Sequence, residues 1–383
     1  MNFLSFDWFA WMAGAVAVYW LLPPSWRDRG LAFMTLGFLA FYAPASAIYL
    51  ILFTLASYYF TRVDPVPGWR VGGVAALIVV VLVHYKLRVA ADSGDVVDDV
   101  LIPLGLSYYS FRCLHYLIER WRGGLPRHDL GDLVCYLFFL PTIVVGPIHR
   151  FEPFRRDLHR KRWDASMLSE GMERILYGYV KIAVLGNFLV SAKIAGWIVA
   201  LGPEHVALAT YLDMVRRGLN IYFQFSGFSD IAIGFALMLG YRVMENFNWP
   251  YLQTNISAFW RSWHISLSSW CRDYIYTVVL SFTRSPALGA LATLLVIGLW
   301  HELSFRYLAW GAWHAAGLIV WQQFQRIKPM LPTIGHPLAR GAVHALSLLL
   351  TVHFVWFSFV LVSQPDFAAA GRVYATILFS WWN

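Results

Sequence analysis

The sequence predicts an all-α, polytopic integral membrane protein with about ten to twelve membrane segments. Three observations predict this fold class. Of the 383 residues, 59% are hydrophobic and only 14% are charged, whereas a soluble domain carries about 25% charged residues. The mean hydropathy is +0.55, and the basic residues fall in the gaps between apolar runs, as the positive-inside rule requires. This composition excludes a disordered protein, a coiled coil and a disulfide scaffold, and it argues against an ordinary cytosolic enzyme.

Apolar runs recur along the whole chain, and we expect them to form one transmembrane domain over residues 1–383. A membrane helix needs about 20 mainly apolar residues, and some runs are too short to span alone. The first run has no basic flank and no small-residue cleavage site, so we expect a retained span rather than a signal peptide. Residues 205–241 are long enough for two segments or for one broken helix. The runs lie near 3–22, 31–43, 45–60, 71–87, 100–118, 131–148, 172–201, 205–241, 276–300, 304–323, 341–363 and 367–381.

The run at 131–148 is predicted to be re-entrant or sharply bent. It alone separates two basic gaps, at 119–130 and 149–163. If both gaps are cytoplasmic, the run between them enters and leaves the membrane on the same side. Proline breaks the helical hydrogen-bond ladder, and the freed backbone groups must be satisfied inside the protein. A proline-kinked span with one basic loop outside is the alternative. The helix breakers in this run are Pro141, Gly146 and Pro147.

The charged and metal-ligating residues exclude several classes of function. The net charge is +8, but the basic residues form no soluble face, so we expect no nucleic-acid binding. The three cysteines form no CxxC pair, and the HExxH zinc motif fails because residue 305 is Phe, so we expect no metal site. No GxSxG, Walker A or GxGxxG motif supports a serine nucleophile or nucleotide use. The acidic run at 92–99 is expected to be a solvated loop.

Residues 245–276 mix Asn, Ser, Arg, His and Asp with Trp and Tyr, and they resemble a lipid-facing span least. Ser257 is a suitable N-cap for a helix that begins near Ala258. On such a helix four aromatic side chains share one face. We therefore expect a helix that is buried among protein or lies at the membrane boundary, where Tyr and Trp are enriched. The four aromatic residues are Phe259, Trp263, Trp270 and Tyr274.

His301 is the strongest candidate for chemistry. It ends an apolar run and is flanked by Trp300 and Trp310. Ionisable groups in or near the membrane core are costly and are functional by default. Burial favours a neutral imidazole, whose lone pair suits a general base. The alternative is a hydrogen-bonded structural histidine at a helix end. His264 is the second candidate, while His314 is expected to pack within its span.

Five motif-rich segments follow one another at 103–123, 138–151, 223–251, 259–276 and 298–314. Taken together and in this order, they resemble the membrane-bound O-acyltransferase (MBOAT) superfamily. The resemblance is closest to its bacterial branch of alginate O-acetylation proteins and teichoic acid D-alanyl transfer proteins. It covers about half of the chain, with a signature core over about 103–314. The resemblance implies re-entrant or broken helices around a central tunnel.

The resemblance also assigns candidate site residues. It implies that His301, in the GLWH segment, matches the essential histidine of the family, and that His264, in the WHIS segment, matches its second histidine. Glu302 stands where the family commonly has Gly, so local packing beside His301 is expected to differ. The remaining residues in the matching motifs are expected to bind substrate or to support the site. They are Asp230, Asn246, Asn248, Arg261, Arg272 and Asp273.

The activity implied by the resemblance is O-acyl transfer at a bacterial inner membrane. An acetyl or D-alanyl group would pass from a cytoplasmic thioester, carried by an acyl carrier protein or coenzyme A, to a hydroxyl of a cell-surface glycan or polymer. No tightly bound cofactor is expected, and other envelope-modification proteins are candidate partners. Arg155, Arg156 and Arg160 would dock the acidic donor, or would only set the topology. A transporter or flippase of an acylated or lipid-linked precursor, and a scaffold for a partner acetyltransferase, are the alternatives.

Overall fold

The computed structural model describes residues 6–91, 105–160, 163–332 and 335–381. These residues form helices and no strand, apart from an isolated antiparallel bridge between Phe247 and Trp263, so the all-α prediction is confirmed. The acidic run at 92–99 lies outside the described residues. The chain divides into two compact units, each described below by itself. The first is Met1–Tyr179 with Gly227–Glu245, and the second is Val180–Ser226 with Asn246–Asn383.

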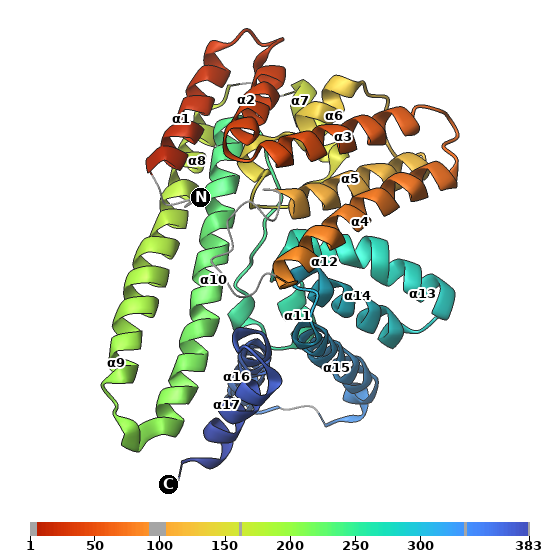
Figure 1. The fold of residues 1–383 in the computed structure, drawn as a ribbon. Helices are drawn as coiled ribbons and strands as arrows, with labels where there is room; N and C mark the ends of the chain where they lie inside the picture. The colour runs from red at the N-terminus through yellow and green to blue at the C-terminus, as the bar shows by residue number, and fades with distance from the viewer. Residues whose placement is uncertain (1–5, 92–104, 161–162, 333–334, 382–383) are drawn as a thin grey trace. The chain divides into compact units, whose positions relative to one another are not determined.

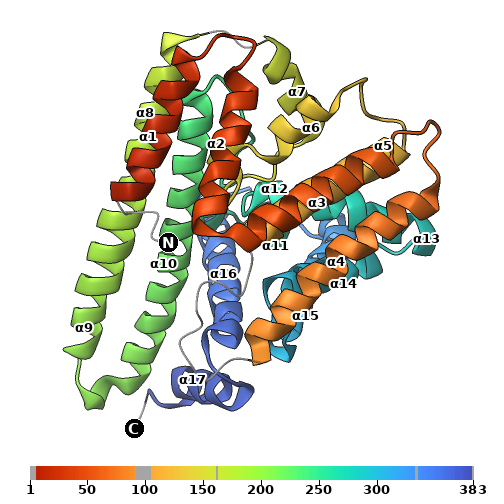
Figure 2. The same ribbon diagram turned by 45° about the horizontal axis from the view of Figure 1, so that its top comes forward.

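The first five helices of the chain, α1 to α5, belong to the first unit (Figures 1 and 2). Within this unit α3, α4 and α5 pack against one another. The hydroxyl of Tyr109 on α5 donates to the carbonyl oxygen of Leu50 on α3 at 2.6 Å, and Ser57 Oγ lies 3.6 Å from Cys113 Sγ. The five helices are α1 (Phe6–Leu21), α2 (Arg27–Tyr42), α3 (Pro44–Phe60), α4 (Gly68–Ala91) and α5 (Leu106–Trp121).

The segment at 131–148 does not form a spanning helix. Asp129 caps α6 (Leu130–Leu137) by accepting from Asp132 N–H at 2.8 Å, and a short 3-10 turn follows at Leu140–Thr142. Eight residues of α-helix are about 12 Å long, against a hydrocarbon core of about 30 Å. No helix continues through the following prolines, so a proline-kinked span is not formed. Re-entry into the membrane stays a prediction.

The bend after α6 is held by buried side chains rather than by a helical ladder. Tyr136 donates its hydroxyl to the carbonyl oxygen of His149 at 2.8 Å, and His115 Nε2 accepts from Phe151 N–H at 3.0 Å. Gly146 has φ +139°, and a Cβ there would lie 2.8 Å from Cβ of Ala232, so only glycine fits this position. The carbonyl oxygen of His149 and the N–H of Phe151 therefore find side-chain partners inside the first unit.

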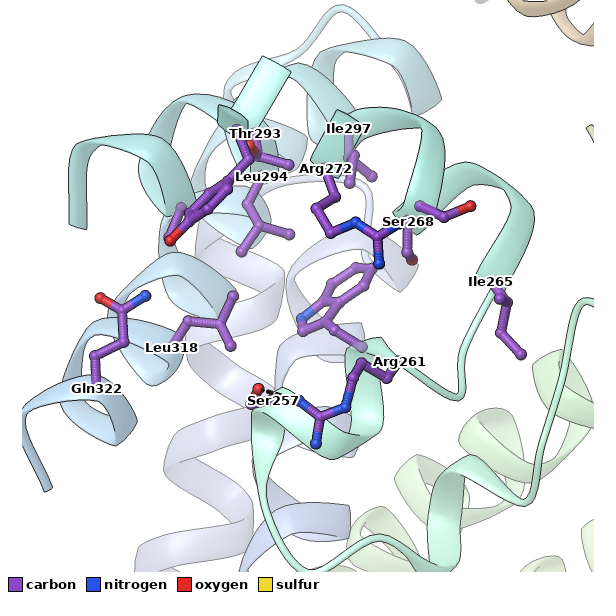
Figure 3. A pocket seen from close by; sticks show the side chains of 14 residues that line it. Ser257, Arg261, Ile265, Ser268, Arg272, Thr293, Leu294, Ile297, Leu318 and Gln322 are labelled. Carbon is purple, nitrogen blue, oxygen red and sulfur yellow. Dashed lines mark hydrogen bonds between the residues drawn. The ribbon is translucent and has the colours of Figure 1, made fainter. Parts of the chain in front are cut away.

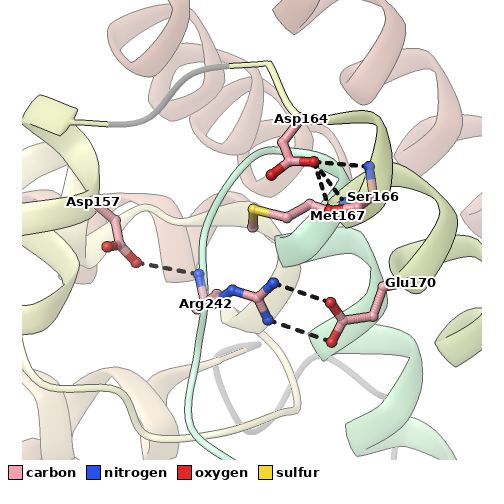
Figure 4. A network of polar contacts seen from close by, with 6 residues as sticks. All are labelled: Asp157, Asp164, Ser166, Met167, Glu170 and Arg242. Carbon is pink, nitrogen blue, oxygen red and sulfur yellow. Dashed lines mark hydrogen bonds and ion pairs between the residues drawn. The ribbon is translucent and has the colours of Figure 1, made fainter.

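A polar network fixes the chain after α10 (Val206–Met238) to α7 (Phe151–Arg160) and α8 (Ala165–Tyr179), all within the first unit (Figure 4). Arg242 donates its backbone N–H to Asp157 at 3.2 Å, and its guanidinium donates to both carboxylate oxygens of Glu170 at 3.1 and 3.4 Å. Asp164 accepts from Ser166 N–H at 2.8 Å before the start of α8. Such bidentate contacts add geometric specificity to an exposed ion pair.

Two long helices belong partly to each unit. The first runs without a break over Ala165–Val199, as α8, a π-helical stretch at Val180–Ile194 and α9 (Ala195–Val199). The second is α10, whose 33 residues are about 50 Å long. The expectation that 205–241 holds two segments or a broken helix is therefore wrong, because no Pro or unpaired turn interrupts the ladder between Val206 and Met238.

The second unit contains an α-helical hairpin, α14 and α15. In the hairpin α14 packs closely on α15, and α15 packs on α16. Gly311 makes this approach possible, since a Cβ there would lie 2.5 Å from the carbonyl oxygen of Leu294. The helices are α11 (Ile256–Trp260), α12 (Ile265–Cys271) with a π-helical turn at Arg272–Tyr276, α13 (Thr277–Thr283), α14 (Pro286–His301), α15 (Phe305–Ile327), α16 (Pro337–Ser363) and α17 (Phe367–Phe379).

Four helices of the described residues are long and apolar enough to cross a membrane. Three shorter apolar helices, at Pro44–Phe60, Pro286–His301 and Phe367–Phe379, fall below that length. These helices support a membrane protein, and the larger number of ten to twelve segments stays a prediction. The four candidate spans are Gly68–Arg88, Ala165–Val199, Pro203–Met238 and Pro337–Ser363.

The single helix expected from Ala258 onward is not formed. Asn255, not Ser257, is the N-cap of α11, and its Oδ1 accepts from Ala258 N–H at 2.8 Å. Helix α11 ends at Trp260, and α12 begins only at Ile265. The expectation that Phe259, Trp263, Trp270 and Tyr274 share one face of a single helix is therefore wrong. The local pattern missed the turn because its partner, Asn246, precedes the expected helix by twelve residues.

Candidate active site

His264 forms the turn between α11 and α12. Its backbone is left-handed, with φ +44°, a conformation that is uncommon for a residue other than glycine. Asn246 holds the turn from both its backbone and its side chain. Its carbonyl oxygen accepts from Ile265 N–H at 2.9 Å, and its Oδ1 accepts from Ser266 N–H at 3.2 Å and from Ser266 Oγ at 2.7 Å. The strain at position 264 is thus maintained by a buried asparagine.

The same asparagine decides which nitrogen of His264 carries the proton. Nδ1 of His264 lies 3.2 Å from Oδ1 of Asn246. The backbone N–H of Ser266 can only donate, so the amide atom that faces it is oxygen, and Nδ1 must donate to that same oxygen. The lone pair of a neutral His264 is therefore on Nε2, the nitrogen that can accept a hydrogen bond or a proton.

His264 is kept neutral by its surroundings. The side chain is only 2% exposed, and the ring of Phe225 packs against it edge-on at 4.7 Å. The residue lies outside the four candidate spans. Burial lowers the pKa of His264 well below its usual range, and the neighbouring His301 lowers it further. The two histidines therefore influence each other electrostatically within the second unit.

His301 ends α14 and is exposed, in contrast to His264. Its imidazole stacks on Tyr307 at 5.8 Å between ring centroids, with an interplanar angle of 27°, and it meets Trp310 edge-on at 5.8 Å. The adjacent Glu302 is engaged elsewhere, because its Oε1 accepts from Arg306 at 3.0 Å. Aromatic rings on two sides therefore orient an imidazole that a substrate can reach.

Trp300 links the two histidines. Its ring lies 4.7 Å from that of His301 and 6.2 Å from that of His264. Gly298 lies one helical turn before His301 on the hairpin, and a Cβ there would collide with the carbonyl oxygen of Tyr307. The close approach of α14 and α15 thus sets the distance between His301 and the rings on α15.

A cavity of about 430 Å³ opens beside this site within the second unit (Figure 3). One stripe of α14, formed by Ala290, Leu294 and Ile297, lines it, and His301 follows Ile297 by four residues on that stripe. Neither His264 nor His301 lines the cavity itself. Trp260 connects the two regions, because it lines the cavity and lies 5.9 Å from Trp310.

Two of the predicted arginines meet at this cavity. Figure 3 shows Arg261, at the end of α11, and Arg272, at the end of α12, directed into the same space. Arg261 donates to Ser257 Oγ at 2.7 Å, and Arg272 Nε lies 2.9 Å from Oδ1 of Asp273. Both arginines are exposed, so their positive charges remain accessible to an anionic group. Asp273 partly neutralises only one of them.

Asp230 and Asn248 belong to different units and differ in burial. Asp230 belongs to the first unit, where it is 6% exposed and forms an ion pair with Arg174 at 2.7 Å. Asn248 is in the second unit but is exposed, and its backbone N–H donates to Ser262 O at 3.0 Å. Asn248 therefore contributes to the site through its backbone pairing, whereas Asn246 contributes through its side chain.

The three arginines predicted to dock a donor differ from one another. Nε of Arg155 lies 2.8 Å from Oδ2 of Asp132, whose other carboxylate oxygen lies 3.1 Å from His159. Arg156 is exposed. The side chain of Arg160 lies outside the described part of the structure. Arg155 therefore has a structural partner in the first unit, and Arg156 is the freer positive charge.

The structure confirms that His314 packs within its helix, and it shows two residues near the candidate site that the sequence did not indicate. His314 is fully buried, and its Nε2 lies 2.8 Å from Ser358 Oγ. Ser266 and Tyr307 were missed. Ser266 follows His264 by two residues in the WHIS segment, which is a local signal. Tyr307 has no such signal, because only the turn after α14 brings it back over His301.

Comparison with known proteins identifies relatives of this chain. The family model described as membrane-bound O-acyltransferase matches residues 125–364. A probable alginate O-acetylase of Pseudomonas aeruginosa is 33% identical over 294 residues, covering 75% of this chain and 54% of that protein. The one from Azotobacter vinelandii is 36% identical over 230 residues, covering 59% of this chain and 45% of that protein. A teichoic acid D-alanyltransferase of Bacillus subtilis is 29% identical over 283 residues, covering 69% of each chain. The aligned part thus spans about half the length of the alginate O-acetylases.

Proposed function

The chain belongs to the membrane-bound O-acyltransferase family, and we propose that it transfers an acyl group from a thioester to a hydroxyl of a cell-surface glycan or polymer. The observation that carries this proposal is an exposed imidazole, His301, oriented by aromatic rings at the end of the helix stripe that lines a cavity. A hydroxyl is a poor nucleophile at neutral pH and needs a base. His301 is a base that both substrates can approach.

The proposed reaction is general-base acyl transfer at His301. The imidazole takes the proton of the acceptor hydroxyl while the oxygen attacks the acyl carbon. The tetrahedral adduct then collapses, the carbon–sulfur bond breaks, and the leaving thiolate takes the proton back from the imidazolium. Base assistance of this kind supplies roughly 10²–10⁴-fold of rate, and positioning of the two substrates supplies much of the remainder.

His264 is proposed to orient the acceptor. Its Nδ1 donates to Asn246, so its Nε2 presents a lone pair. A lone pair accepts a hydrogen bond from a hydroxyl but cannot stabilise an oxyanion, which needs a donor. Burial keeps this ring neutral and adds no second positive charge beside the imidazolium that forms at His301. The two histidines would thereby divide the work, one holding a hydroxyl and the other removing its proton.

The cavity is proposed to hold the thioester donor. Its α14 and α15 walls are mostly apolar, which suits an acyl chain or a pantetheine arm. Arg261 and Arg272 supply positive charge on the same space, which suits the acidic part of a donor.

We propose that the protein resides in a bacterial inner membrane as a multi-pass enzyme. A central tunnel would let a cytoplasmic donor meet an acceptor from outside.

The acyl group is proposed to be acetyl or D-alanyl, as in the proteins named above. The alginate O-acetylases share 31–36% of residues with this chain over the aligned parts, and the D-alanyltransferases share 26–29%. This difference favours acetyl. Mass spectrometry of surface glycans from a deletion strain and its complemented parent decides the point, because the acyl group lost on deletion is read directly.

Donor docking is proposed for the exposed Arg156. Arg155→Glu would also break its ion pair with Asp132 and disturb α7, so that variant tests folding as much as docking. Arg156→Glu reverses an exposed charge. It should raise the KM for the acyl donor several-fold at low salt and leave kcat unchanged. An unchanged KM, with topology verified, would assign this arginine to membrane orientation alone.

The central test is His301→Ala in the purified full chain. Transfer from a radiolabelled thioester to the polymer should fall by about 10²–10⁴-fold while membrane insertion and the melting midpoint are retained. His336→Ala is the matched control, since that histidine is exposed in the loop before α16. A transporter or flippase needs no base, so undiminished turnover in the His301 variant would favour that class. Absence of thioester consumption by the purified wild-type chain would indicate a scaffold.

A further inference from the structure

A second cavity, with a polar lining, lies in the first unit where α3 and α5 end. Its volume is about 470 Å³. The loop between α3 and α4 forms one wall, and the loop after α5 forms the other. Gly123 turns that second loop back with φ +71°, a conformation suited to glycine. The side chains that matter are Arg62, Asp64, Tyr116, Arg120, Arg127 and His128.

Positive charge dominates this cavity. It is lined by three arginines and one carboxylate, that of Asp64. Within the part of the chain that the structure describes, no ion pair joins Arg62, Arg120 or Arg127 to a carboxylate. Three guanidinium groups that share one hollow without carboxylate partners repel one another, and an anion between them would relieve that repulsion.

The arginines are held in place by other contacts. Arg120 donates to the carbonyl oxygens of Thr61 at 3.1 Å and Val63 at 3.4 Å, which ties the α3–α4 loop to α5. The guanidinium of Arg62 lies over the rings of Tyr58 at 5.8 Å and Tyr59 at 5.6 Å. Stacking of this kind leaves the edge of a guanidinium, with its N–H donors, directed at a ligand.

The opposite wall supplies a fixed polar surface without a negative charge. His128 Nδ1 lies 2.7 Å from the carbonyl oxygen of Pro126, so this nitrogen donates. Its Nε2 then accepts from the hydroxyl of Tyr116 at 2.9 Å. The ring is therefore neutral in this arrangement. The cavity has a net positive lining because only one carboxylate opposes the three arginines.

The surroundings of the cavity are those of a membrane boundary. Helix α4, a candidate span over Gly68–Arg88, begins directly after the α3–α4 loop. Trp69 is 71% exposed at its start, and a Cβ at Gly68 would lie 3.5 Å from Nε1 of the exposed Trp121. Exposed tryptophans beside the end of an apolar helix mark the headgroup level of a bilayer.

An apolar face leads away from the cavity along α3. Leu55 and Tyr59 are exposed and, four residues apart, share one face of α3. Arg62 follows the end of this helix by two residues, and its guanidinium lies over the ring of Tyr59. A headgroup held by Arg62 would therefore have its acyl chains beside exposed apolar side chains. Free phosphate would gain nothing from that face.

We infer that this cavity binds the phosphate of an anionic phospholipid, with Arg62 and Arg127 as its ligands and Arg120 holding the loop that carries Arg62. Basic pockets between membrane helices on the cytoplasmic side take anionic headgroups, whose attraction is about 1 kcal/mol per arginine. That value corresponds to about a fivefold change in affinity for each arginine removed. The inference is independent of the proposed acyl transfer.

Native mass spectrometry of the full chain in detergent tests the inference. Wild type is titrated with dioleoylphosphatidylglycerol, dioleoylphosphatidylcholine or inorganic phosphate, and bound molecules are counted. One phosphatidylglycerol should be retained in preference to phosphatidylcholine. Arg62→Gln and Arg127→Gln should each weaken that retention about fivefold, and the double variant about 25-fold. Arg62→Lys, which keeps the charge, should retain most of the affinity.

The matched control is Arg70→Gln, which removes the same charge from the start of α4, where the guanidinium lies over Trp69 at 5.3 Å, outside the cavity. This variant should bind phosphatidylglycerol as wild type does. Equal losses in the Arg70 and Arg62 variants would show general attraction and overturn the site. Equal retention of phosphatidylcholine would overturn the anionic preference, and equally tight binding of inorganic phosphate would assign the site to free phosphate. Size-exclusion profiles identify any variant that misfolds, and Arg62→Lys then carries the comparison with Arg70→Gln.

Discussion

At the scale of single residues, the two histidines of the second unit differ in burial, and this difference is the basis of the separate roles proposed for them. His264 is buried and fixed by Asn246, whereas His301 is exposed and lies against aromatic rings. A buried neutral ring suits positioning, and an exposed ring suits proton transfer to a substrate that must enter and leave. Two identical side chains thus have different surroundings, from which different roles are proposed.

The first prediction concerns Asn246. Asn246→Ala removes the oxygen that accepts from His264 and Ser266, and it leaves buried donors unsatisfied at a cost of about 1–3 kcal/mol each. We expect a lower melting midpoint in detergent and a loss of acyl transfer. Asn248→Ala is the stability control, because that exposed residue uses its backbone. Equal destabilisation by both variants would contradict the role given to the Asn246 side chain.

The second prediction concerns pH. In the unfolded chain a histidine takes up a proton near its ordinary pKa of about 6.5. Native His264 stays neutral, because burial lowers its pKa. Protonation of His264 therefore favours the unfolded chain. The free energy of unfolding is unaffected by this histidine above about pH 6.5, and it falls below that pH by up to about 1.4 kcal/mol per pH unit.

The measurement is the melting midpoint of wild type and His264→Gln between pH 7.5 and 5.0, expressed as slopes rather than absolute values. The variant should show a shallower decline on acidification. Asn248→Ala, at an exposed position without a titratable group, should keep the wild-type slope. If the melting midpoint of the His264 variant declined as steeply as that of wild type, proton uptake by His264 would not contribute to the pH dependence of stability.

At the scale of elements, the α14–α15 hairpin builds the candidate active site. Glycines at 298 and 311 let the two helices approach to backbone contact. The approach brings Tyr307 and Trp310 of one helix onto His301 of the other. The sequence indicates both apolar helices and both glycines, but the order of residues along the chain does not indicate that 307 folds back over 301.

The third prediction tests this approach. Gly311→Val places a side chain against the carbonyl oxygen of Leu294 and should force the helices apart, at a cost of about 1–3 kcal/mol. Acyl transfer should fall by more than the loss of folded protein explains, because His301 loses its rings. Gly371→Ala on α17 is the control, since nothing lies within 4 Å of a Cβ there. Full activity in the Gly311 variant would show that the ring contacts of His301 are not needed for acyl transfer.

At the scale of the whole molecule, the composition and the four candidate spans describe a chain that resides in a membrane. The orientation of the basic gaps is a further expectation, which depends on residues 131–148. Since α6 has eight residues and is followed by a buried bend, this segment is too short to cross as a helix. Re-entry would place both flanking gaps on one side of the bilayer.

The fourth prediction follows from re-entry. Arg122→Cys and Glu152→Cys place thiols at exposed positions on either side of 131–148. A membrane-impermeant maleimide should label both from the cytoplasmic side only. The natural cysteines provide a low background, because Cys113, Cys135 and Cys271 are all buried. Labelling of the two positions from opposite sides would show a crossing segment instead.

The sequence by itself determined the class of this protein: composition and hydrophobic run length require a helical chain in a lipid environment, and short motifs around His264 and His301 indicated the family and its chemistry. Periodicity is a local property, so it also located most helices. Tertiary structure alone decided the turn at His264, the unbroken length of α10 and the rings over His301. Each of these depends on partners distant in the chain, such as Asn246 for His264, and no pattern of neighbouring residues records which distant group will supply a hydrogen bond or a packing surface.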